Sequence, residues 1–218
     1  MTVDDSKLRQ DVLDELSWQP NVPSDQITVT AEQGIVHLAG YVTTYAQKVA
    51  AEQAVKRVVG VRAAVVESLE VKVADGICGF DEEIAMRARA SISWAALLPS
   101  GQVQVNVQNR WITLSGQLDW HFQRAAAEAV VRNLAGVAGV TNEITLRARP
   151  QTTDLKAAIE RALRRCADLD ARFIRVKVVD GLVTLEGAVG SWHARERAQE
   201  AAWMAPGVSA VHDMLIVT

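Results

Sequence analysis

The chain has 218 residues, of which 49% are hydrophobic and 22% are charged, and its net charge at pH 7 is −3. This balance is typical of folded globular domains. Binding to a phosphate backbone needs clustered Lys and Arg, which the sequence lacks, so nucleic acid is disfavoured as a partner. The first residues mix charges with apolar side chains, and no stretch resembles a membrane span, so we predict a cytoplasmic protein unless a signal was removed.

Three segments of the chain repeat one pattern. A glycine is followed twenty residues later by a second glycine and then by valine, in the pairs Gly40 and Gly60, Gly116 and Gly136, and Gly187 and Gly207. The unit is about seventy residues long, which is enough for a small domain. We therefore predict three domains, over residues 1–74, 79–148 and 150–218.

Each repeat begins with helical periodicity, as in the apolar stripe of Leu8, Val12 and Leu16. Two runs of alternating β-type residues follow, which predict a hairpin with one buried face. The tight turns between them are Gln33-Gly34, Asn109-Arg110 and Asp180-Gly181. The same alternation places one residue of each repeat on the opposite face, namely Ile35, Trp111 and Leu182.

The second half of each repeat contains another helix. We expect the hairpin to end at the first glycine of the pair and the helix to begin at a polar cap, which is Thr44, Asp119 or Ser191. The second glycine suits a left-handed helix stop, and a short third strand follows it. Each repeat therefore reads αββαβ, and the predicted fold class is α+β, with three-stranded sheets each covered by two helices.

The motifs of the third repeat resemble the BON domain, a family named for bacterial osmotically inducible and nodulation proteins. They are the strand 181–187, the helix start 191–195 and the turn 205–208. The resemblance covers nearly the whole chain as three tandem copies, although Arg110 replaces the usual glycine of the second copy. It implies a non-enzymatic, stress-related role, with phospholipid or membrane-surface binding proposed for several exported members.

No group of residues predicts catalysis, a cofactor or a metal site. The histidines do not recur at equivalent positions or at metal-ligand spacing; they are His37, His121, His193 and His212. Cys78 and Cys166 are also non-equivalent, and we expect two reduced thiols. We predict no enzyme and no cofactor.

One basic residue recurs at the same position of all three repeats, as Lys48, Arg124 and Arg195. Four residues later stand Glu52, Glu128 and Gln199, so we favour exposed i,i+4 pairs, each worth about 0.2–0.5 kcal/mol where both charges exist. Contact of the basic residue with a lipid phosphate is the alternative.

The six tryptophans outnumber the other aromatic types. Trp18 and Trp94 are repeat equivalents at the end of the first helix, where we predict core caps. Trp192 and Trp203 are about three helical turns apart and project from the same side of the last helix, away from its small residues. Their partner is another repeat, a second subunit, or a membrane or other protein.

Trp111 and Trp120 of the middle repeat extend this set, and we favour packing of all four between repeats. The candidate interaction surface therefore comprises Trp111, Trp120, Trp192, Trp203, Lys48, Arg124 and Arg195. The function predicted is that of a binding or assembly module on anionic phospholipid or a membrane surface. The alternative is a scaffold that self-associates or docks a protein without lipid.

Overall fold

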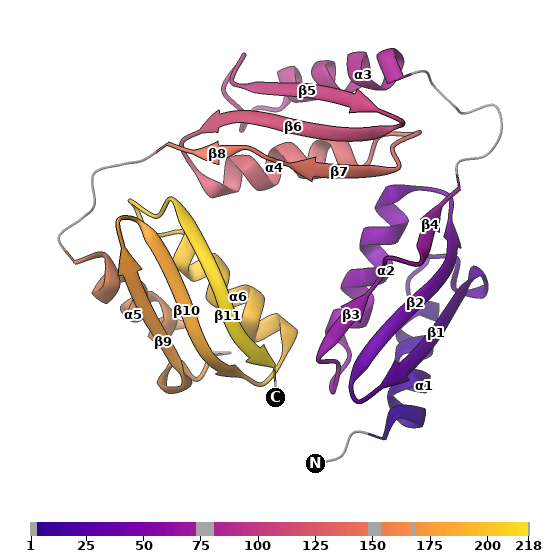
Figure 1. The fold of residues 1–218 in the computed structure, drawn as a ribbon, viewed down its shortest axis with the longest axis horizontal. Coiled ribbons are helices and arrows are strands. Elements are labelled where there is room, and N and C mark those ends of the chain that lie inside the picture. The colour runs from indigo at the N-terminus through magenta and orange to yellow at the C-terminus, as the bar shows by residue number, and fades with distance from the viewer. Residues whose placement is uncertain (1–3, 73–80, 148–153, 167–168, 218) are drawn as a thin grey trace.

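A computed structural model of the chain describes residues 4–72, 81–147, 154–166 and 169–217. It contains three units of similar construction, as Figure 1 shows. The first consists of α1 (Asp5–Ser17), η1 (Ser24–Gln26), β1 (Ile27–Glu32), β2 (Ile35–Val42), α2 (Tyr45–Arg57), β3 (Ala63–Val65) and β4 (Leu69–Val71). Cys78 and the segments that connect the units lie outside the described residues.

The other two units follow the same order. The second consists of α3 (Asp81–Trp94), β5 (Val103–Gln108), β6 (Trp111–Leu118), α4 (His121–Arg132), β7 (Gly139–Asn142) and β8 (Thr145–Leu146). The third consists of α5 (Leu155–Arg165), η2 (Ala171–Phe173), β9 (Ile174–Val179), β10 (Leu182–Val189), α6 (Trp192–Trp203) and β11 (Ala210–Val217). The predicted α+β class and the αββαβ order are confirmed, and the third strand is interrupted in the first two units.

Each unit has a mixed sheet with the hairpin's second strand in the middle. The first two strands pair antiparallel, and the third runs parallel to the second on its other side. Alternate residues of the middle strand, such as Val36 and Leu38, are fully buried under the two helices. Each unit has its own hydrophobic core, so each is a small domain.

The hairpin turns adopt left-handed backbone conformations, as predicted from their sequences. Gln33 and Gly34 have φ of 52° and 82°, and Asn109 and Arg110 have 51° and 65°. The first residue of the preceding helix holds each of these two turns, because Asp5 accepts the N–H groups of Gln33 and Gly34, and Asp81 accepts those of Asn109 and Arg110. This link between helix and hairpin explains how Arg110 is held where glycine is usual.

The repeated glycines mark a close approach of two strands. Gly40, Gly116 and Gly187 have φ between 119° and 133°, and a Cβ there would collide with a carbonyl oxygen just before the first strand. The middle strand continues two residues past each glycine, so the predicted strand ends were wrong. The second helices likewise end at Arg57, Arg132 and Trp203, before the glycines that were predicted to stop them.

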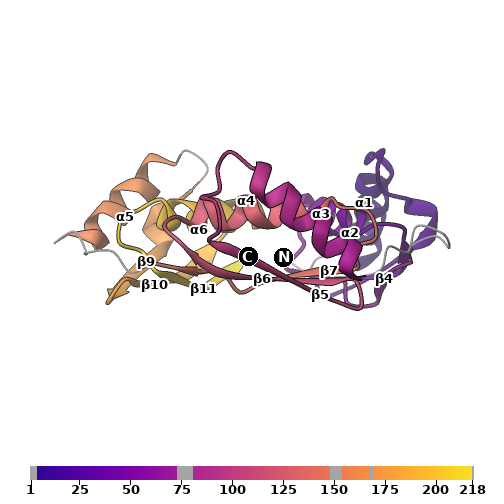
Figure 2. The same cartoon turned by 90° about the horizontal axis from the view of Figure 1, so that it is seen from above.

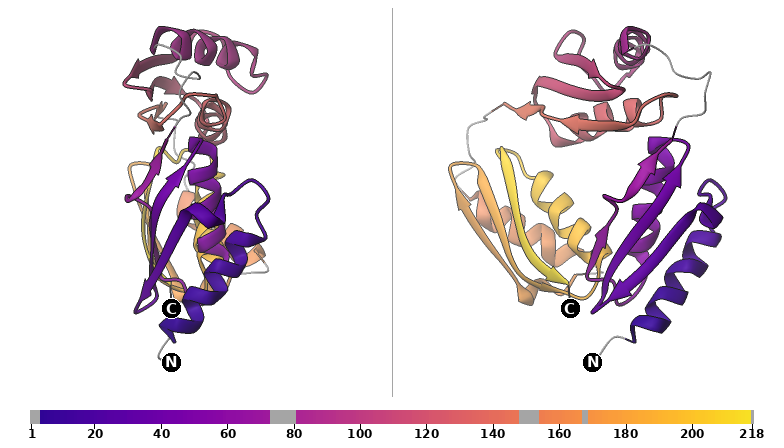
Figure 3. Two further views of the ribbon diagram at one scale, coloured as in Figure 1. Left: turned by 90° about the vertical axis from the view of Figure 1, so that its right-hand side faces the viewer. Right: turned by 45° about the vertical axis from the view of Figure 1, so that its right-hand side comes forward.

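The three domains form a triangle (Figure 1). The second helices α2, α4 and α6 lie toward its centre and the first helices α1, α3 and α5 toward its rim. Seen from above, the three sheets form one layer and the helices another (Figure 2), and the views in Figure 3 agree. The molecule therefore has a sheet side and a helix side.

Candidate interaction surface

Trp192, the first residue of α6, joins the third domain to the first. Its ring packs against the hydrophobic cores of both domains. Lys56 Nζ of α2 lies 5.2 Å from the centre of the indole, and the Arg195 guanidinium lies 4.7 Å from it. The two cations stabilise the electron-rich ring faces, so the contact combines apolar burial with cation–π attraction.

His121, the first residue of α4, joins the second domain to the third. Its imidazole stacks on the Trp203 indole of α6, with ring centres 4.2 Å apart and planes inclined by 12°. Burial lowers the pKa of His121, and the nearby Arg124 lowers it further, whereas Glu200 and Glu128 oppose the shift. The neutral imidazole is therefore the favoured partner of Trp203.

Tyr45, the first residue of α2, joins the first domain to the second. It packs against the hydrophobic core of the second domain, and the nearby backbone of Val140 acts to lower the pKa of its hydroxyl. Burial raises the pKa of Tyr45, and Glu128 of the second domain raises it further. The phenol therefore stays neutral at this contact.

The residues that make these three contacts occupy equivalent positions of the repeat. Tyr45, His121 and Trp192 each stand five residues after the first repeat glycine. The positions sixteen residues after that glycine are Lys56, Arg132 and Trp203, and two of them receive the aromatic residue of another domain. For the third, Arg132 is near enough to Tyr45 to influence its pKa, which it lowers against the larger effect of burial. Each domain thus inserts the start of its second helix against the next domain, and the sequence closes into a ring with approximate threefold symmetry.

Two of the three recurrent basic residues, Arg124 and Arg195, bind within their own domains. Arg124 donates to the carbonyl oxygen of Asn142 at 3.3 Å, and Arg195 donates to Asp213. Burial lowers the pKa of Lys48, although Glu52 and Glu67 act against it. The predicted i,i+4 pairing of charges was therefore wrong for Arg124, because its guanidinium reaches the third strand of its sheet instead. Arg195, which has the neutral Gln199 at the i+4 position, also reaches the third strand.

The four candidate tryptophans divide between two environments. Trp192 and Trp203 lie at contacts between domains of the same chain. Trp111 lies on the sheet side, 48% exposed, where it covers Gly139 and donates from Nε1 to Thr141 Oγ1 at 2.7 Å. The prediction that Trp111 packs between repeats was wrong, because glycine in the neighbouring strand leaves room for the ring locally.

Trp120 occupies the N-cap position of α4, which the sequence analysis assigned to Asp119. Its ring stacks beside Phe122, with centres 6.5 Å apart. Asp119 is instead paired with Arg147 at 3.2 Å. The capping group here is Gln123, whose Oε1 accepts the N–H groups of Asp119 and Trp120.

Trp18 and Trp94 are the most exposed tryptophans in the described part of the chain, at 79% and 87%. The predicted role as core caps was wrong, because both residues lie at the end of the first helix with their side chains in solvent. Ser17 and Ser93, again repeat equivalents, donate their hydroxyls to the carbonyls of Asp14 and Ala90, both at 2.7 Å. These bonds give a donor to a backbone carbonyl group in the last turn of each helix, and the following indole stays exposed to solvent.

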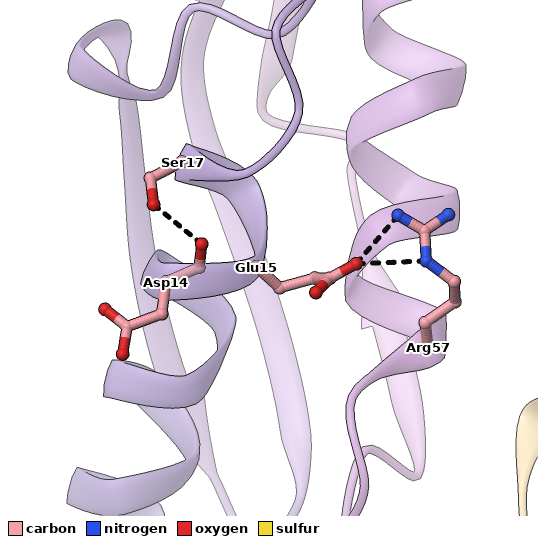
Figure 4. Close-up of polar contacts among 4 residues, drawn as sticks. All are labelled: Asp14, Glu15, Ser17 and Arg57. Carbon is pink, nitrogen blue, oxygen red and sulfur yellow. Dashed lines mark hydrogen bonds and ion pairs between the residues drawn. The ribbon is translucent and has the colours of Figure 1, made fainter.

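The end of α1 is fixed further by an ion pair with α2. Arg57 donates from Nε and Nη2 to Glu15 Oε1 at 3.0 and 2.8 Å, as Figure 4 shows beside the Ser17 bond. The structure therefore presents Trp18 on a supported helix end. In Figure 2 the helices α1 and α3, whose ends carry Trp18 and Trp94, lie on the side away from the sheets.

Metal-binding groups and membrane-spanning helices are both absent from the described residues. Within residues 4–72, 81–147, 154–166 and 169–217, no three His, Cys, Asp or Glu side chains are grouped to hold a metal ion. In the same ranges no helix is long and apolar enough to cross a membrane.

The fold defines an α+β protein of three tandem repeats. The BON domain model matches residues 4–73, 80–148 and 151–218, and the chain belongs to the BON domain family. It is 30% identical over 149 residues to the osmotically-inducible protein Y of Escherichia coli (strain K12), an alignment that covers 65% of this chain and 72% of that protein.

Solved structures were matched at low similarity. CdsD, a structural protein of the type III secretion system of Chlamydia trachomatis, is 16% identical with a TM-score of 0.27, over 97% of this chain and 92% of that one. The PrgH periplasmic domain is 14% identical with a TM-score of 0.24, over 94% of this chain and 99% of that one.

Proposed function

We propose that this protein is a non-enzymatic, stress-related binding protein that associates peripherally with phospholipid membranes through its helix side. The observation that carries the proposal is the exposure of Trp18 and Trp94 at repeat-equivalent positions. Indole rings favour the boundary between water and acyl chains, where one end is apolar and the other hydrated. The similarity to an osmotically-inducible protein supports the stress-related setting.

The ring geometry makes the two tryptophans work together. Residues at equivalent positions of a threefold ring lie at the same height along its axis, so Trp18 and Trp94 can meet one flat surface at once. The third equivalent position is Arg165, which is exposed and follows Arg164. A guanidinium there can pair with a lipid phosphate while the indoles enter the interface. Two linked insertions give more affinity than either alone.

The test is binding to vesicles with and without anionic lipid. We expect the Trp18→Ser and Trp94→Ser double variant to bind at least about tenfold more weakly, a loss of about 1.4 kcal/mol or more. A Val179→Ser and Met214→Ser variant is the matched control, because both residues are exposed and apolar on strands of the sheet side. Equal binding by the tryptophan variant and the native chain would remove the proposal.

A second function is favoured by the sheet side. Ile35, Trp111 and Leu182 are repeat equivalents that face outward from the three middle strands, and all are exposed. A threefold set of apolar residues on one layer suits a protein partner or a second copy of the ring. Light scattering over a range of concentrations tests self-association; an Ile35→Ser and Leu182→Ser variant should then remain monomeric where the native chain does not.

A further inference from the structure

In the first two domains, a glutamine side chain binds the backbone N–H groups at the start of the second helix. Gln47 Oε1 accepts the backbone N–H groups of Thr43 and Thr44 at 2.9 and 3.3 Å. In the second domain Gln123 Oε1 accepts those of Asp119 and Trp120 at 3.2 and 3.1 Å. The start of the second helix is thus satisfied by an amide oxygen that reaches back from the third position of the helix.

The third domain lacks that glutamine. The equivalent residue is Ala194, and Gly190 replaces Thr43 and Asp119. Ser191 still caps α6 by accepting the N–H of Ala194 at 3.1 Å. In the part of the chain that the structure describes, however, the N–H groups of Gly190 and Ser191 have no side-chain acceptor to replace the missing amide.

An apolar cavity lies where the missing side chain would be. Its volume is about 360 Å³, and it is lined by Leu169, Phe173, Ala188, Val189, Gly190 and Ala194, with Asp170 at one side. The cavity therefore has an apolar lining on one side and, on the other, the start of α6, where no glutamine amide accepts the backbone N–H groups. Small-molecule sites commonly combine an apolar body with a few fixed polar groups in this way.

A second glutamine is also missing from the third domain. Gln26 and Gln102 are repeat equivalents whose Oε1 atoms are buried in the first two domains. Phe173 replaces them, and its ring is 63% exposed at the cavity. Two amide side chains have thus been exchanged for a methyl group and an outward phenyl ring, which changes a filled site into an open apolar one.

We propose that this cavity binds a primary amide carried on a short aliphatic chain. The amide oxygen would accept the N–H groups of Gly190 and Ser191, as Gln47 and Gln123 do in the sister domains, and the aliphatic part would lie against Leu169, Phe173 and Val189. The amide NH2 can donate to Asp170, whose carboxylate also accepts from Arg172 at 2.8 and 2.7 Å. An anionic head group would meet repulsion from that carboxylate, so an amide fits better than a carboxylate.

The experiment is a titration of the full-length protein with hexanamide, followed by ¹⁵N NMR. We expect saturable shifts at the amides of Gly190 and Ser191 at millimolar ligand, and no comparable shifts at Thr43 and Thr44. Ala194→Gln restores the internal amide, so it should weaken hexanamide binding at least about tenfold. Glu196→Gln, an exposed change on the same helix, is the matched control and should bind like the native chain.

Two further ligands and one further variant test the same proposal. Hexylammonium offers no acceptor and should bind at least about tenfold more weakly than hexanamide, and hexanoate should also be weaker. Phe173→Gln copies the residue of the other two domains and should also lose hexanamide binding. It provides a second test in case the Ala194→Gln variant does not fold. The absence of any shift at Gly190, equal binding by the Ala194→Gln variant, or stronger binding of hexanoate would overturn the amide site.

Discussion

The inner and outer helices of the ring use the same residue type in opposite ways. On the inner helix α6, Trp192 and Trp203 are partly buried against neighbouring domains, whereas Trp18 and Trp94 at the ends of α1 and α3 are almost fully exposed. All four stand near a helix end. Their environments differ because the start of each second helix points at the next domain, and the end of each first helix points at solvent. The position of the helix in the ring therefore decides whether its tryptophan is buried or exposed.

The strongest test of this difference is Trp192→Ala. The change removes a ring that packs on two hydrophobic cores, so we expect the free energy of unfolding to fall by about 2–4 kcal/mol. This is somewhat below the roughly 3–5 kcal/mol expected when a fully buried aromatic side chain is truncated to alanine. The third domain should also leave the first, and small-angle X-ray scattering should show a larger radius of gyration. Trp94→Ala is the control. An unchanged radius in the Trp192 variant would contradict the ring closure.

Trp111 gives an intermediate case, because it is half exposed but packed locally. Gly139→Ala would place a Cβ 2.4 Å from a carbon of the indole ring and displace the ring from Thr141, which should lower the free energy of unfolding by about 1–3 kcal/mol. The measurement is the urea midpoint. The double variant Trp111→Leu with Gly139→Ala copies the Leu182 and Ala210 pair of the third domain, so it should recover most of the loss. Failure to recover would show that the two residues do not act as a pair.

The contact of His121 with Trp203 should depend on pH. Because the pKa of His121 is lowered in the folded state, the unfolded chain binds the proton more readily. The stabilisation is therefore complete above the unfolded pKa of about 6.5 and is lost as pH falls below it. We expect the melting temperature to fall more steeply below about pH 6.5 in the native chain than in the His121→Phe variant. Arg124, Glu128 and Glu200 are unchanged in that variant; parallel curves would refute the expectation.

The smallest effect on stability is expected at the outer rim. Trp18→Ser and Trp94→Ser should each change the free energy of unfolding by no more than about 0.5 kcal/mol, since the indoles are exposed in the free protein. Thermal unfolding measures this directly. A loss of more than about 1 kcal/mol would mean that these rings pack in solution, which would weaken the comparison between inner and outer helices.

The fold was largely predictable because local patterns repeat three times. Alternation located the hairpins, and the turn residues were assigned correctly down to the left-handed Asn109 and Arg110. The hydrogen bonds from the turns to Asp5 and Asp81 were missed, since nothing in the local periodicity links a helix start to a turn about thirty residues later. Trp18 and Trp94 were misplaced because residue type favoured burial while the helix end prevented it.

The candidate surface was less predictable, because it depends on how domains sit against one another. Trp192 and Trp203 were singled out as unusual, but Tyr45 and His121 were not, although both share the repeat position of Trp192. A large ring at the first residue of all three second helices was the available signal. The open cavity beside Ala194 also had a signal, namely the loss of the glutamine found at positions 47 and 123.

The head-to-tail contact has a consequence for assembly. Each domain carries one projecting aromatic residue and one receiving helix end, and the closed ring uses every one of them within the chain. If Trp192 left Lys56, the ring would open. The third domain would then expose its projecting Trp192, the first domain would expose the helix end that receives it, and these two surfaces are complementary. Chains opened in this way would join end to end into filaments, so closure of the ring also limits polymerisation.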